Sequence, residues 1–220
     1  MTDQRLIKID TEHFAIRLLV PVLTIGLTLG VYVGGRLLLS EVLADSVNPV
    51  CVALPIAAVM LFGGSYVVEA ALKQVMPSRR AATLDDDALV VSDARRKPPQ
   101  LVAINWAQTV NVLAWRFEVR RRTRVPKGWF CMAVQLLQDE QSVILYSFFE
   151  PKAADALPGY HHFVRLRPRK ETESNQDLAA VAEQRRLLKL EDERWDDGAE
   201  LHRKDFAAVL DKLQQYVWKE

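Results

Sequence analysis

The chain has 220 residues, half of them hydrophobic, and a formal net charge of +1. This length allows one globular domain, or a small domain with an anchor. Residues 1–80 carry 7 Lys/Arg and 6 Asp/Glu, whereas residues 81–220 carry 22 Lys/Arg and 22 Asp/Glu. The first part therefore has the composition of a membrane anchor and the second that of a soluble domain. The balanced charge of the second part argues against a protein that binds nucleic acid electrostatically.

Two long apolar runs near the N-terminus predict a pair of transmembrane helices. The first, Leu18–Gly35, has 18 residues without a charge, and the second, Val50–Val68, has 19. Each run approaches the ~30 Å thickness of a hydrocarbon core at ~1.5 Å per residue. Both are apolar on every face, and a chain of this size has nothing large enough to bury them. We therefore expect a transmembrane hairpin in residues 1–80, with helices at about 14–39 and 49–75, and a soluble domain in residues 81–220.

The distribution of Lys and Arg predicts the orientation of this hairpin. Basic residues precede the first run and follow the second. They are Arg5, Lys8, Arg17, Lys73, Arg79 and Arg80. The connecting stretch 40–48 contains Glu41 and Asp45 but no Lys or Arg, although Arg36 lies close to it. The positive-inside rule then places both termini in the cytoplasm. The expected location is the inner (cytoplasmic) membrane of a bacterium, crossed twice.

Three glycines of the first run, Gly26, Gly30 and Gly34, recur at intervals of four residues. This spacing places them on one face of a helix, where small residues let two backbones approach closely in lipid. Two interpretations are open for this glycine ridge. It packs against the second helix of the hairpin, or it docks another membrane subunit or a second copy of the chain.

The rest of the sequence predicts an α+β domain. Apolar or alternating segments indicate strands at residues 88–91, 101–106, 110–120, 129–137 and 142–149, with a further strand at 163–169. A helical segment is expected from residue 174 to about 193, and Asp197 with Glu200 resembles a capping box. An apolar stripe then predicts a C-terminal amphipathic helix that packs on the sheet, with the residues Phe206, Val209, Leu210, Leu213 and Val217.

Three short segments of the soluble part carry a family resemblance. They are Leu84–Val91 after the membrane exit, Ile104–Val110 with an I-x-W pattern, and Tyr146–Lys152 ending in Glu-Pro-Lys. Placed after a two-helix hairpin, residues 81–217 resemble the PH-like domain of bacterial membrane proteins. The resemblance implies an antiparallel β barrel or curled sheet with a C-terminal helix. It also implies a binding or scaffolding module.

The sequence shows no constellation of catalytic, metal-binding or cofactor-binding residues. None of the four histidines has metal-ligand spacing with Cys or carboxylates. No P-loop, Rossmann fingerprint or nucleophile elbow occurs. We therefore expect a protein that is not an enzyme and that holds no cofactor or metal.

Basic clusters are the most informative polar features of the soluble part. They form three groups, which are Arg95, Arg96 and Lys97; Arg120, Arg121, Arg122, Arg124 and Lys127; and Arg165, Arg167 and Arg169. One interpretation is solvated strand ends that are balanced by acids elsewhere. Another is contact with anionic headgroups, where each nearby Lys or Arg contributes ~1 kcal/mol of attraction, or with an acidic partner.

The sequence therefore predicts a non-catalytic, membrane-anchored adaptor or accessory subunit of a membrane protein complex. Its expected partners are membrane lipids and other membrane subunits or a second copy, and no nucleic acid. The alternative prediction is a membrane-tethered module that recognises anionic lipid headgroups through the arginine clusters.

Overall fold

The computed structural model describes residues 5–10, 14–42, 48–95, 97–120, 125–167 and 178–219. The chain divides into two compact units. The helical unit comprises residues 11–78, and the sheet unit comprises residues 1–10 together with 79–220. The helical unit is thus inserted into the sequence of the sheet unit.

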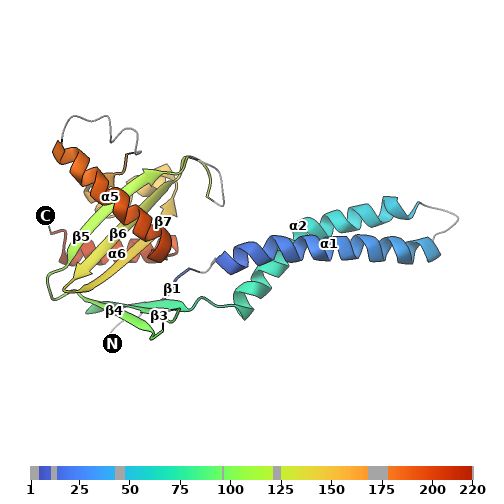
Figure 1. Cartoon of the computed structure of the whole chain (residues 1–220), viewed down its shortest axis with the longest axis horizontal. Coiled ribbons are helices and arrows are strands. Elements are labelled where there is room, and N and C mark those ends of the chain that lie inside the picture. The colour runs from blue at the N-terminus through green and yellow to red at the C-terminus, as the bar shows by residue number, and fades with distance from the viewer. Residues whose placement is uncertain are drawn as a thin grey trace. The chain divides into compact units, whose positions relative to one another are not determined.

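The helical unit consists of α1 (Phe14–Val42) and α2 (Pro49–Val75), which pack side by side (Figure 1). Asn48 caps α2 by accepting a hydrogen bond from the backbone N–H of Val50. Both helices are long and apolar enough to cross a membrane, with mean hydropathies of 1.9 and 2.1 over their spans. Only 6% and 17% of their apolar windows are buried, so neither is packed like the core helix of a soluble protein.

The first sheet has four antiparallel strands in the order β1-β2-β3-β4. They are β1 (Arg5–Lys8), β2 (Arg80–Leu84), β3 (Ala88–Asp93) and β4 (Gln100–Asn105). β1 precedes the helices and β2 follows them, so neighbouring strands flank the inserted unit. Residues 1–10 therefore lie in the sheet unit and not with the hairpin helices, and the alternation of the four-residue β1 is too short to recognise in the sequence.

The second sheet has the order β8-β5-β6-β7-β9. Its centre is an antiparallel meander of β5 (Asn111–Glu118), β6 (Phe130–Gln138) and β7 (Gln141–Phe149). Two short strands, β8 (Val164–Arg165) and β9 (Ala199–Glu200), add in parallel at the edges. The strand expected at 163–169 is therefore reduced to β8 within the residues that the structure describes.

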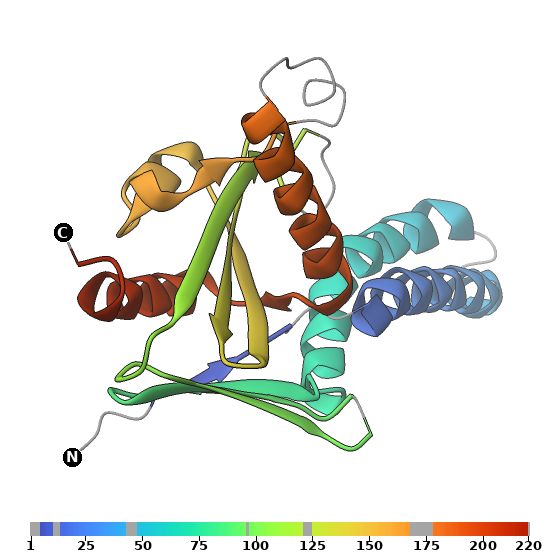
Figure 2. The same ribbon diagram turned by 60° about the vertical axis from the view of Figure 1, so that its left-hand side comes forward.

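The described strands form two separate sheets and no closed barrel, which corrects the barrel form of the prediction (Figure 2). The free edge of β4 shows why the first sheet does not continue by pairing β4 with a strand of the second sheet. The backbone N–H of Ala103 donates to Gln141 Oε1 at 2.6 Å, and that of Asn105 donates to Gln138 Oε1 at 2.8 Å. Side-chain amides of β6 and β7 thus satisfy amides that a further strand would otherwise pair.

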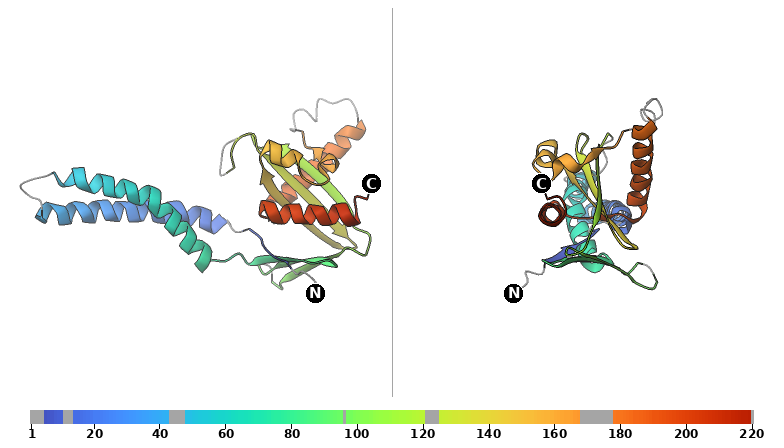
Figure 3. Two further views of the ribbon diagram at one scale, coloured as in Figure 1. Left: turned by 180° about the vertical axis from the view of Figure 1, so that it is seen from behind. Right: turned by 90° about the vertical axis from the view of Figure 1, so that its left-hand side faces the viewer.

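The remaining elements are α3 (Pro151–Asp155), the 3-10 helix η1 (Tyr160–His162), α5 (Leu178–Asp197) and α6 (Arg203–Tyr216). α5 and α6 cover opposite faces of the second sheet (Figure 3). The predicted capping box is wrong, because Asp197 ends α5 and Glu200 lies in β9. The N-cap of α6 is His202, whose side chain makes no capping hydrogen bond.

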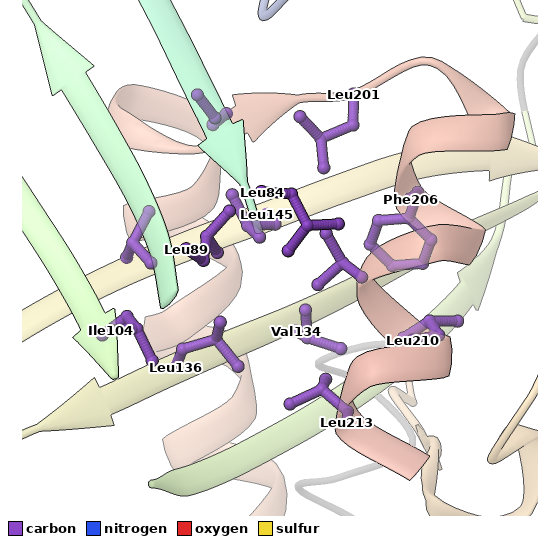
Figure 4. Packing of buried hydrophobic residues seen from close by; sticks show 14 of the residues in the cluster. Leu84, Leu89, Ile104, Val134, Leu136, Leu145, Leu201, Phe206, Leu210 and Leu213 are labelled. Carbon is purple, nitrogen blue, oxygen red and sulfur yellow. The ribbon is translucent and has the colours of Figure 1, made fainter. Parts of the chain in front are cut away.

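The main core lies between the two sheets and α6 (Figure 4). Four residues of the predicted apolar stripe are buried there, namely Phe206, Val209, Leu210 and Leu213. They meet Leu84 and Leu89 of the first sheet and Val134 and Leu145 of the second in one cluster. The amphipathic C-terminal helix is therefore confirmed, and it holds the two sheets around one core.

Candidate functional site

The basic residues selected from the sequence separate into distinct places in the fold. Arg96, Arg121, Arg122, Arg124 and Arg169 lie outside the described residues. Arg95 and Lys97 follow β3 on the first sheet, and Lys127 lies exposed just before β6. Arg120, Arg165 and Arg167 line one common hollow.

This hollow, which we term the arginine groove, exists because β8 pairs in parallel with β5. Arg165 lies opposite Arg116 in the register, and the backbone N–H of Leu166 donates to Arg116 O at 2.8 Å. The pairing brings two basic clusters together that are far apart in the sequence. The groove has a volume of about 230 Å³, and its lining residues are Phe117, Glu118, Arg120, Arg165, Leu166, Arg167 and Leu188.

The lining of the arginine groove is apolar inside and basic outside. Phe117 and Leu166 pack against the small core under α5, and Leu188 is likewise half-buried. The three arginines are exposed. An apolar wall beside exposed guanidinium groups is suited to a ligand that combines an apolar group with negative charge.

Gln184 of α5 fixes the backbone at Arg165 and Arg167, two of the three arginines that line this groove. Its side chain is buried, and its Oε1 accepts a hydrogen bond from Arg167 N at 2.8 Å. Its Nε2 donates to Arg165 O at 3.1 Å. A second hollow of about 310 Å³ adjoins this contact, lined by Val164, Arg165, Arg167, Ala180, Glu183 and Gln184.

Two of the arginines that line the groove, Arg165 and Arg167, keep their charge exposed. Within the described part of the chain, neither Arg165 nor Arg167 forms an ion pair. The acids that line the two hollows are Glu118 and Glu183, against three arginines. The positive charge of Arg165 and Arg167 is therefore available to an external anion.

A buried ion pair anchors the C-terminal half of α5 on the second sheet. Arg194 is 4% exposed, and its guanidinium donates to Glu191 at 2.7 and 2.8 Å. Glu191 also accepts from Trp115 Nε1 at 3.1 Å, while Arg194 stacks 4.3 Å from the centre of the Tyr146 ring. Burial raises the pKa of the Tyr146 hydroxyl far above its ordinary value, so this group stays protonated at neutral pH. The cluster therefore has a structural role.

A second buried ion cluster lies where the chain leaves and re-enters the sheet unit. Arg80 contacts Asp10 at 2.9 Å and Asp93 at 3.2 Å, and it donates to the carbonyls of Asp197 and Gly198 at 2.9 Å each. Arg95 reaches Asp93 from outside at 2.8 Å. Burial alone would raise the pKa of the Asp93 carboxyl, but hydrogen bonds from Arg95 and the charge of Arg80 lower it below its ordinary 3.8. We term this set the junction cluster.

The glycine ridge of α1 takes no part in the close contact with α2. A Cβ atom added at Gly26, Gly30 or Gly34 would meet nothing within 4 Å. In contrast, Thr24 is buried, and a Cβ at Gly35 would lie 3.9 Å from Ala53 of α2. At ~100° per residue, Gly26 and Gly30 lie about 160° and 120° around α1 from Thr24. Packing inside the hairpin therefore does not account for the ridge.

The described residues contain no group of His, Cys, Asp and Glu that could hold a metal ion. Comparisons of the chain with family models, with curated proteins and with solved structures find no match.

Proposed function

We propose that the chain is a non-catalytic, membrane-anchored adaptor or accessory subunit of a membrane protein complex. In this proposal α1 and α2 cross a bacterial inner membrane with both termini in the cytoplasm. The sheet unit is then a PH-like binding module. Support for the PH-like assignment comes from a chain of antiparallel strands followed by a C-terminal helix that fills their common core.

One observation carries this proposal: the glycine ridge lies away from α2 and faces open space. A run of glycines lowers helix stability unless a close backbone approach compensates for it. Within the described residues no such neighbour is present for Gly26, Gly30 or Gly34. Two spans are also too few to build a pore or a transporter alone. A transmembrane helix of another subunit, or of a second copy, fits this surface.

The experiment is purification of the tagged full chain from its own membranes in mild detergent, with identification of the proteins that co-purify. Gly30→Leu should abolish the association, because the new side chain occupies the space of the docked helix. Gly63→Leu on α2 is the matched control, since it makes the same change at a glycine that also faces open space. A wild-type chain that purifies alone, or an association that survives Gly30→Leu, would overturn the proposal.

The alternative, recognition of anionic headgroups, is favoured by the position of Arg95 and Lys97. They follow the last residue of β3, which pairs with Arg80, the first residue of β2 after the helical unit. There the backbone N–H of Ala94 donates to Arg79 O at 2.9 Å. The opposite end of the same strands carries the acidic turn of Asp85, Asp86 and Asp87. Basic charge is thus concentrated at the end tethered to the proposed anchor.

This alternative is tested with fluorescent labels on full-length chain in proteoliposomes that contain headgroup-quenching lipids. Lys97→Cys reports on the tethered end and Asp86→Cys on the opposite end, both in a Cys51→Ser background because Cys131 is buried. Headgroup recognition predicts stronger quenching at position 97, and a further increase when phosphatidylglycerol replaces neutral lipid. Equal quenching at the two positions would rule it out.

A further inference from the structure

We infer that the arginine groove binds an acidic segment of a partner protein, with an apolar side chain inside and carboxylates on its arginines. The inference rests on the proposed adaptor function and names the chemistry of the cytoplasmic partner. It concerns Arg120, Arg165 and Arg167 together with the apolar wall of Phe117, Leu166 and Leu188.

The size and lining of the groove determine the apolar part of the ligand. A cavity of ~150 Å³ lined by apolar side chains already accommodates a benzene ring. The arginine groove has about 230 Å³ of space beside Phe117, Leu166 and Leu188. One large apolar or aromatic side chain therefore fits this space. A simple inorganic anion would leave the apolar wall uncovered.

The arginines determine the charged part of the ligand. Arg165 at the end of β8 and Arg167 two residues later both line this groove, and both also line the hollow beside it. The Gln184 side chain accepts a hydrogen bond from Arg167 N and donates one to Arg165 O, so the backbone at both residues is held in place before a ligand arrives. A guanidinium group binds a carboxylate through two parallel hydrogen bonds. Carboxylates on either side of an apolar residue complement this arrangement.

The position of the groove on α5 favours a protein segment over the bilayer surface. The chain connects to the helical unit at Asp10 and Arg79, and Arg80 binds the carbonyls of Asp197 and Gly198 at the C-terminal end of α5. The groove contacts α5 at Leu188, in the middle of the helix. From Leu188 to Asp197 the helix rises ~13 Å, which exceeds the ~8 Å Debye length at physiological salt. Charges at the C-terminal end of α5, where Arg80 binds, are therefore largely screened from this groove.

Fluorescence anisotropy of a labelled acidic peptide tests the inference on full-length chain in neutral detergent micelles. The probe is Gly-Glu-Asp-Phe-Glu-Asp-Gly, and its comparison is the same peptide with Ser in place of Phe. Wild-type chain should bind the Phe peptide at least fivefold more tightly than the Ser peptide. The double variant Arg165→Gln/Arg167→Gln should weaken binding at least tenfold.

The matched control is Arg185→Gln/Arg186→Gln, which removes the same charge from exposed positions of α5 that do not line the groove. It should change the affinity less than twofold. Equal losses in the two double variants would show a general charge effect and overturn the inference, as would a wild-type chain that binds neither peptide.

A lipid ligand is distinguished by repeating the titration in nanodiscs. Affinity for the peptide should be the same within twofold in neutral and in anionic nanodiscs at physiological salt. If anionic lipid displaces the peptide from both the wild-type chain and the Arg185→Gln/Arg186→Gln control, which keeps the groove intact, the groove is a headgroup site and the inference is wrong. Failure of peptide binding while the membrane partner still co-purifies through the glycine ridge would overturn this inference alone and leave the adaptor function standing.

Discussion

Replacement of Arg80 by methionine should destabilise the sheet unit strongly, because this side chain holds the segments on both sides of the inserted helices. The Arg80 side chain is 5% exposed, and its guanidinium contacts two carboxylates and two backbone carbonyls. Methionine keeps much of the apolar stem but removes all four contacts. Asp10 would then lose the partner that its Oδ2 contacts at 2.9 Å.

The expected magnitude follows from the burial of the two partners. Asp10 and Asp93 have side chains that are 17% and 11% exposed, so both are largely removed from water. Removal of one member of a buried ion pair costs about 3–5 kcal/mol, because the other charge is left uncompensated. Arg95→Met is the matched control, since Arg95 pairs with the same Asp93 but is 43% exposed. An exposed pair contributes about 0–1 kcal/mol.

The assay is guanidinium chloride unfolding of full-length variants in detergent micelles, followed by tryptophan fluorescence. Trp106 and Trp115 lie in the cores of the sheet unit and report on its unfolding. Arg80→Met should lower the free energy of unfolding several times more than Arg95→Met. Equal losses in the two variants, or a loss below about 1 kcal/mol for Arg80→Met, would refute this interpretation of the junction cluster.

Three further predictions concern the same unit. Phe206→Ala should cost about 3–5 kcal/mol in the same unfolding assay, because its ring is fully buried between the two sheets. Gln138→Leu removes the amide that bonds both the N–H and the C=O of Asn105, and it should cost about 1–3 kcal/mol and speed hydrogen exchange at Asn105. Because the folded-state pKa of Asp93 is lowered, its contribution is complete above pH 3.8 and is lost as the pH falls through the folded value. Asp93→Asn should therefore flatten the stability profile in this acid range, and an unchanged slope would contradict the assignment.

Local patterns were sufficient to predict the elements that are long or strongly periodic. The uncharged runs Leu18–Gly35 and Val50–Val68 lie within α1 and α2. The apolar segments at 129–137 and 142–149 correspond closely to β6 and β7. In each case the pattern of apolar residues along the sequence is enough to indicate the element.

Features that depend on distant pairing could not be read from the sequence. β1 has four residues, and its partner β2 follows only after the whole helical unit. β8 has two residues, so the pairing that joins Arg165 and Arg167 to Arg120 leaves no local pattern. The glycine spacing places Gly26, Gly30 and Gly34 along one side of α1, but only the burial of Thr24 and the contact of Gly35 with Ala53 show that this side is not the one in close contact with α2.

Site-specific photo-crosslinking in native membranes is the most direct test of the central claim that α1 docks another transmembrane helix. A photoreactive residue at Leu23 lies three positions before Gly26 on the ridge side of α1, and one at Phe62 of α2 is the control; both positions are exposed. The proposed function predicts a discrete protein adduct at position 23, from one membrane protein or a second copy, and none at position 62. Lipid adducts alone at both positions would contradict it.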